Sequence, residues 1–98
     1  MTIDKINNGT ELTIKLSGRL DTSTAPELEN TLKESLDSIT ALTFDFSDLE
    51  YVSSAGLRVL LSAQKTMNTQ GSMRLTNVSD LIMEIFEVTG FCDILTIE

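Results

Sequence analysis

The sequence predicts a single α/β domain of 98 residues, with a mixed β-sheet and three main helices mostly on one of its faces. In two segments apolar residues alternate with polar ones, which is typical of strands with one dry face. In two others leucines recur at helical spacing. No linker, repeat or low-complexity tract divides the chain. We therefore expect one domain over residues 1–98, with the element order β-β-α-β-α-β-α-β.

The N-terminal part of the chain predicts a β-hairpin. Residues 2–7 are a weak strand, and Asn8-Gly9 suits a tight turn with positive φ. Residues 12–16 alternate between apolar and polar side chains, so they form the second strand. Gly18 then lets the chain bend.

A first helix should follow this strand. Thr24 and Glu27 stand three residues apart as a capping box, and Pro26 falls in the first turn. The apolar stripe of this helix consists of Leu28, Leu32, Leu36 and Ile39. Alternation over residues 42–46 then predicts the third strand, and "SDLEYV" leads on to two serines.

The second half of the chain predicts two more helices and two short strands. One amphipathic helix runs from Ser54 to about Thr69 and ends at Gly71, and a short strand includes Met73 and Leu75. A third helix is capped by Asn77 or Ser79 and ends at Gly90. Residues 94–97 form the last strand.

The composition argues against several functions. A net charge of −8 is unfavourable for binding nucleic acid, which requires a surplus of Lys and Arg. The chain has no histidine, so Ser-His and Cys-His pairs, His-containing zinc sites and an imidazole base are absent. Glu27, Glu29 and Glu34 should ring the exposed side of a helix rather than converge. We therefore expect that the protein is not an enzyme and that it binds no cofactor or metal.

The sequence also indicates where the protein resides. No apolar run approaches the ~20 residues that span a bilayer, and "MTIDKINNGTEL" lacks the features of a signal peptide. The single cysteine, Cys92, fits a reducing compartment and is expected to be a small buried hydrophobe. Met67 and Met83 are expected to fill the core. The prediction is a cytoplasmic protein without membrane insertion.

Two loops are the expected place for a partner. Ser53 and Ser54 follow the third strand directly, while Asp21, Thr22 and Ser23 follow the second. Sites in open α/β sheets gather outside the carboxyl ends of the strands. Both loops should therefore lie at the same edge of the domain. A partner would meet the protein either at these loops or on the sheet face that stays partly wet.

Three segments resemble the STAS domain of bacterial anti-sigma factor antagonists: "SGRLDTSTAPEL", "FDFSDLEYVSSAGLRVLL" and "LIMEIFEVTGF". The resemblance implies that Ser54 is phosphorylated by a dedicated serine kinase, which is also the anti-sigma factor, and dephosphorylated by a serine phosphatase. The chain departs from the family pattern at two positions. Ser53 stands where the family often has aspartate, and Ala55 stands where it often has a second hydroxyl.

The resemblance and the loops together give a set of candidate partner-binding residues: Asp21, Thr22, Ser23, Ser53, Ser54, Gly56 and Leu57. Some also have a simpler structural interpretation. Ser53 is a preferred N-cap residue, Ser54 could be a cap or a first-turn residue, and Asp21 could be a turn residue or an alternative cap.

Three functions remain open from the sequence. In the first, the protein binds the kinase when Ser54 is free and is released on phosphorylation. In the second, the protein is an accessory subunit of a membrane transport or sensory complex. In the third, Ser54 is the nucleophile of a small hydrolase, although no base accompanies it.

Overall fold

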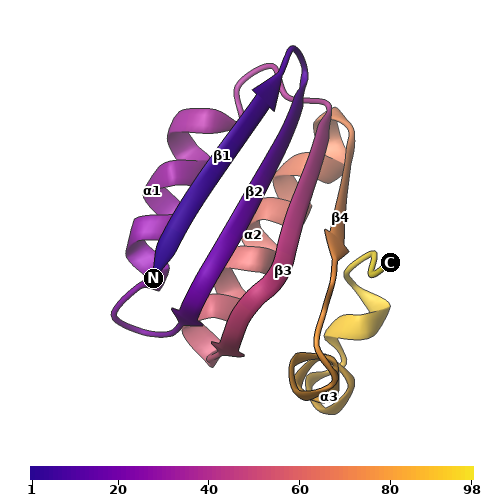
Figure 1. Cartoon of the computed structure of the whole chain (residues 1–98). Coiled ribbons are helices and arrows are strands. Elements are labelled where there is room, and N and C mark those ends of the chain that lie inside the picture. The colour runs from indigo at the N-terminus through magenta and orange to yellow at the C-terminus, as the bar shows by residue number, and fades with distance from the viewer.

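The computed structural model describes residues 1–98 and contains one four-stranded sheet with strand order β1-β2-β3-β4 (Figure 1). Along the chain the elements are β1 (Thr2–Asn8), β2 (Glu11–Leu20), α1 (Ala25–Ser35), β3 (Ala41–Val52), α2 (Ser54–Gln70), β4 (Ser72–Thr76), α3 (Asp80–Thr89) and the short 3-10 helix η1 (Phe91–Asp93). The predicted α/β class and the mixed sheet are confirmed.

The strand directions follow from the connections. β1 and β2 are antiparallel and joined by the predicted tight turn, in which Gly9 has φ +65° and Asn8 pairs with Glu11. β2, β3 and β4 are parallel, because each of their connections contains a helix. Their carboxyl ends therefore lie at one end of the molecule, the lower end in Figure 1.

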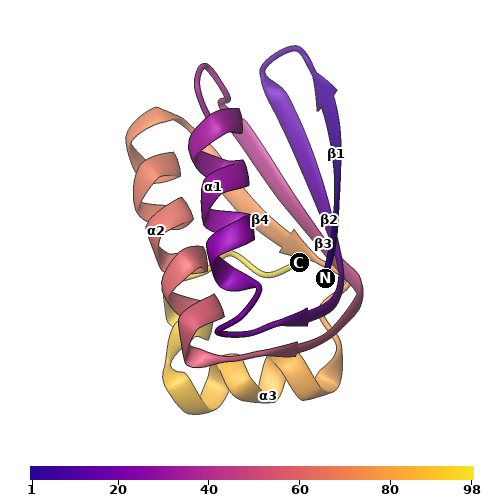
Figure 2. The same ribbon diagram turned by 90° about the vertical axis from the view of Figure 1, so that its left-hand side faces the viewer.

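The helices divide between a face and an end of the sheet. α1 and α2 cover one face, and the other face stays open (Figure 2). α3 lies instead beyond the carboxyl ends of the strands, in both views. There the ring of Phe86 packs 6.4 Å, centroid to centroid, from that of Phe46 in β3. No helix is long and apolar enough to cross a membrane.

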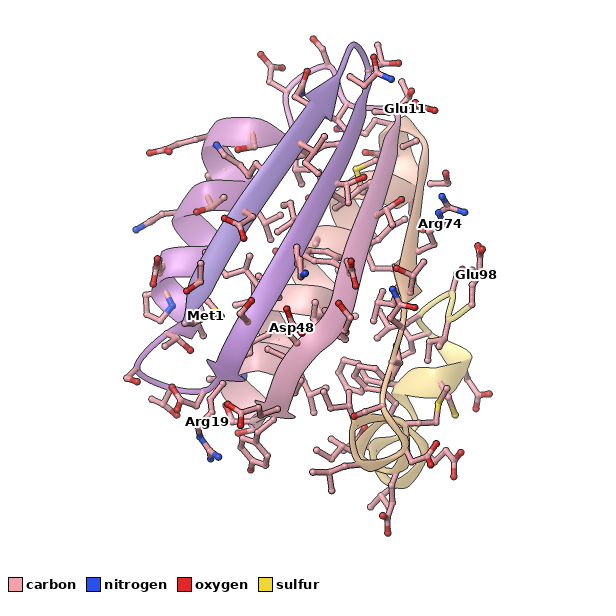
Figure 3. All side chains as sticks on the ribbon, viewed as in Figure 1. Met1, Glu11, Arg19, Asp48, Arg74 and Glu98 are labelled. Carbon is pink, nitrogen blue, oxygen red and sulfur yellow. The ribbon has the colours of Figure 1, made fainter.

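A single cluster of 24 buried apolar residues forms the core between the sheet and its helices. The inward face of β2 contributes Ile14 and Leu16, as the alternation predicted, and α2 contributes Leu60 and Met67. On the open face, polar side chains pair instead. The Lys15 ammonium of β2 lies 3.1 Å from the carboxylate of Asp48, which Figure 3 labels on β3.

The C-terminal segment differs from the expectation. Residues 94–97 do not form a full strand, because η1 occupies Phe91–Asp93 and only Ile97 makes a parallel bridge, to Leu75 of β4. The prediction that Cys92 is buried is wrong. Its side chain is exposed on η1, where the 3-10 turn directs Leu95 inward instead.

Candidate functional site

The loops that follow β2 and β3 lie side by side, as predicted. Leu20 and Val52, the last residues of the two strands, are register partners. The Ser53 N–H donates to the Leu20 carbonyl over 2.8 Å and ties the start of the second loop to the end of β2. The site is therefore built on the carboxyl ends of two central, well-packed strands.

The two adjacent serines have different surroundings. Ser53 is the N-cap of α2, and its Oγ accepts a hydrogen bond from the Gly56 N–H over 3.4 Å. Its hydroxyl thus satisfies one of the unpaired donors of the first turn. Ser54 is the first residue of α2, is exposed, and its hydroxyl makes no hydrogen bond within the protein. Ser54 is therefore the serine with a free nucleophilic oxygen.

The surroundings of Ser54 favour a negative charge. The first turn of α2 contains no acidic residue, and the N-terminus of this 17-residue helix carries the positive end of the helix dipole. Arg58 follows Ser54 by four residues, a spacing that brings two side chains together on one helix face. Arg58 is exposed and forms no ion pair, so its guanidinium is available.

Asp21 organises the neighbouring loop. Its carboxylate accepts hydrogen bonds from the Ser23 hydroxyl, over 2.7 Å, and from the backbone N–H groups of Ser23 and Thr24. The Ser23 hydroxyl bond, followed by those backbone bonds, outweighs partial burial and lowers the pKa of the Asp21 carboxyl below its ordinary value. Thr22 and Ser23 themselves are exposed at the loop tip.

The capping box predicted for α1 is not formed. The Thr24 hydroxyl donates to the Arg19 carbonyl over 2.8 Å and accepts from the Asp21 N–H over 2.9 Å, so it makes no side-chain cap bond to α1. Thr24 faces the preceding turn because the Asp21 carboxylate already binds its backbone N–H. The interpretation of Asp21 as a turn residue describes this geometry.

Gly56 and Leu57 lie beneath the surface of the site. Leu57 is buried in the core. Gly56 is also buried, and a Cβ at this position would come within 2.7 Å of Leu20 Cγ and 2.9 Å of the Leu20 carbonyl oxygen. These two residues set the distance between α2 and β2, and hence the position of Ser54, rather than presenting side chains to solvent.

Sequence analysis missed two features of this end of the molecule. The first is a groove of about 330 Å³ between the N-terminal halves of α1 and α2. Its walls are formed by Thr22, Ala25, Pro26, Glu29, Ala55, Arg58, Val59 and Ser62. The spacing of Ser54 and Arg58 could have pointed to Arg58, but the groove depends on how the two helices pack.

The second feature is a contact between the ends of β2 and β3. The Arg19 guanidinium, labelled at the end of β2 in Figure 3, stacks 4.5 Å from the centre of the Tyr51 ring and also faces Asp21 at 3.8 Å. Arg19 and Tyr51 are register partners. The cation–π contact joins the two strands beside the loop of Asp21.

The chain is similar to known proteins over nearly its whole length. A family model described as "Mlab, STAS domain" matches residues 5–96. The anti-sigma-B factor antagonist of Bacillus subtilis (strain 168) is 29% identical over 96 residues, which make up 97% of this chain and 88% of that protein. BtrV of Bordetella bronchiseptica, named as an anti-sigma factor antagonist, is 35% identical over 96 residues, or 96% of this chain and 81% of BtrV.

Among solved structures, the fold resembles that of the anti-sigma factor antagonist SpoIIAA in two chemical forms. The unphosphorylated form gives a TM-score of 0.77 at 16% identity and covers 99% of this chain and 87% of that one. The phosphorylated form, described as a Bacillus cell fate determinant, gives a TM-score of 0.76 at 17% identity, with coverage of 99% and 91%. At these identities the likeness is one of fold.

Proposed function

The chain belongs to the STAS domain family, and from that premise we propose that it is an anti-sigma factor antagonist controlled by phosphorylation of Ser54. With Ser54 free, the loops at the carboxyl ends of β2 and β3 bind a serine kinase that is also the anti-sigma factor. When the kinase transfers the γ-phosphoryl group of ATP to Ser54 Oγ, the hydroxyl proton is lost, ADP leaves and the antagonist is released. A serine phosphatase then restores the hydroxyl.

The observation that carries the proposal is the free hydroxyl of Ser54. It is exposed on the first turn of α2, while the neighbouring Ser53 hydroxyl is engaged as the cap. A kinase can therefore reach Ser54 without breaking a bond that holds the helix. The protein acts as a substrate and a binding partner rather than as a catalyst, since no histidine accompanies the serine.

The same geometry supports release without unfolding. A phosphate on Ser54 would add about −1.5 to −2 charges beside unpaired N–H groups and the positive end of the helix dipole, where the fold tolerates it. On the docking surface those charges would meet the partner and would have to be desolvated. Binding thus becomes unfavourable while the helix stays in place.

The relatives support the same function. Two curated relatives that align with nearly the whole chain are named anti-sigma factor antagonists. SpoIIAA, which shares the fold, is described in both an unphosphorylated and a phosphorylated form.

The phosphate acceptor can be tested by incubating the protein with ATP and the serine kinase anti-sigma factor from the same cell. We expect a single phosphate on Ser54, found by mass spectrometry of peptides. Ser54→Ala should abolish it. Ser53→Ala is the matched control, because it should lose only the cap, worth about 1 kcal/mol of stability, and remain a substrate.

Phosphate mainly on Ser53 would contradict the assignment. If a membrane transport subunit copurifies with the protein and no kinase does, the accessory-subunit function replaces this one.

A further inference from the structure

The outer face of α3 carries a stripe of three apolar side chains, of which two are exposed and the third, Ile85, is half-buried against the core. We call this set the α3 stripe: Leu81, Ile85 and Val88. They share one helix face, because Ile85 follows Leu81 by four residues and Val88 follows Ile85 by three. Leu81 is 57% exposed and Val88 is 80% exposed, and the stripe lines a shallow hollow together with Glu84 and Thr89. On the face of α3 that packs against the core, Ile82 and Phe86 are fully buried. Leu81 and Val88 are therefore not needed to hold α3 in place.

Acidic side chains without partners flank one side of the stripe. Asp80, Glu84 and Glu87 on α3 are exposed, and none of them forms an ion pair. The chain contains no Lys or Arg after Arg74, whose guanidinium pairs with Glu98. Any surface that covers the stripe must therefore bring its own positive charges.

We propose that the α3 stripe docks a basic amphipathic helix of another protein. Apolar residues of that helix would cover Leu81 and Val88, and flanking Lys or Arg side chains would pair with the carboxylates of Glu84 and Glu87. A second copy of this chain fits poorly, because a two-fold contact through α3 would oppose the same carboxylates to themselves. An anionic membrane surface would be repelled in the same way.

The stripe is distinct from the Ser54 surface although both lie at the same end of the molecule. α3 and the first turn of α2 both lie beyond the carboxyl ends of the strands (Figures 1 and 2), but no residue of the stripe belongs to the loops around Ser54. Docking on α3 should therefore not depend on the state of Ser54, and its test does not depend on the proposed function.

The test titrates the isotope-labelled domain with a peptide of about five helical turns that has leucines on one face and lysines on the other. A peptide of the same composition in scrambled order is the control. We expect NMR shift changes centred on α3. Leu81→Ser combined with Val88→Ser should weaken binding at least about tenfold, while the melting temperature should fall by no more than a few degrees because both side chains are largely exposed.

Two matched variants sharpen the result. Ile6 on β1 is 65% exposed but stands alone, so Ile6→Ser should leave the affinity within about twofold, as should Ser54→Asp. Equal binding of the scrambled peptide would show general attraction to an acidic surface and overturn the proposal. An equal loss with Ile6→Ser would show that the apolar contact is not specific to α3 and would also overturn it. So would a dimer that forms at rising concentration and is lost in the Leu81→Ser, Val88→Ser variant.

Discussion

The neighbouring hydroxyls of Ser53 and Ser54 at the start of α2 differ in their hydrogen bonds. The Ser53 hydroxyl accepts the Gly56 N–H, and its modification would remove a cap worth about 1 kcal/mol. The Ser54 hydroxyl has no such role, so its modification costs the fold little. In the proposed function, Ser53 therefore holds the helix, and Ser54 regulates the surface.

Two aspartates make stability depend on acidity. The pKa of the Asp45 carboxyl is lowered, first by the Asn77 side-chain N–H and then by the Ser47 backbone N–H, and that of Asp21 is lowered first by the Ser23 hydroxyl. Groups with a depressed pKa in the folded state stabilise it above their unfolded pKa, and this stabilisation is lost as the pH falls through the folded pKa. We expect the melting temperature to decrease as the pH is lowered below about 4.

Asp45→Asn and Asp21→Asn should each flatten that fall, as measured by thermal unfolding between about pH 7 and pH 2.5. Asp37→Asn is the control, since Asp37 is exposed and its carboxylate accepts no hydrogen bond. A pH profile that is the same in all three variants would show that other carboxylates govern acid unfolding.

At the scale of elements, the site depends on how closely α2 approaches β2. Gly56 permits this approach, because any side chain there would press on Leu20. Alanine in a helix is ordinarily more stable than glycine by about 0.5–1 kcal/mol. Here the predicted Cβ contact with the Leu20 carbonyl is shorter than 3.0 Å, so strain should exceed that gain.

Gly56→Ala should therefore destabilise the domain by about 1–3 kcal/mol and displace the first turn of α2. Urea unfolding measures the change. Ser54→Ala, two residues away on the exposed side of the same turn, should stay within about 0.5 kcal/mol of the parent protein. A Gly56→Ala variant as stable as the parent would mean that the contact with Leu20 relaxes freely.

The elements were predictable where apolar periodicity was strong. They were less predictable where the extent of a strand depends on its pairing with a neighbouring strand. Alternation predicted the strands, and the glycine that ends α2 and the serine that caps α3 lie where expected. The last strand was not predictable in extent. η1 intervenes, β4 is only five residues long, and the chain reaches it with Ile97 alone.

The site was partly predictable for the same reason. Local rules identified Ser53 as a cap and placed both loops at one edge, because parallel strands end together. The groove beside Arg58 and the stacking of Arg19 on Tyr51 arise from packing between distant segments, which no local pattern specifies.

At the scale of the whole molecule, the fold separates a rigid core from the surfaces that meet partners. The 24 residues of the core form one continuous cluster between the sheet and its helices. Ser54 and the α3 stripe lie at the end of the molecule, on elements anchored to that core by Leu57 and Phe86. The proposed function therefore expects a charge added at this end to alter binding without disturbing the packing.

In the proposed function, phosphate on Ser54 weakens kinase binding without unfolding the domain. Isothermal calorimetry of the unphosphorylated and phosphorylated proteins with the kinase, with a melting curve for each, tests it directly. We expect phosphorylation to weaken binding by about 10- to 100-fold, which needs only about 1.4 to 2.7 kcal/mol. The melting temperature should shift by no more than a few degrees, since a charge at a helix terminus is worth about 0.3–1 kcal/mol. Unchanged affinity, or a loss of stability as large as the loss of affinity, would contradict the account.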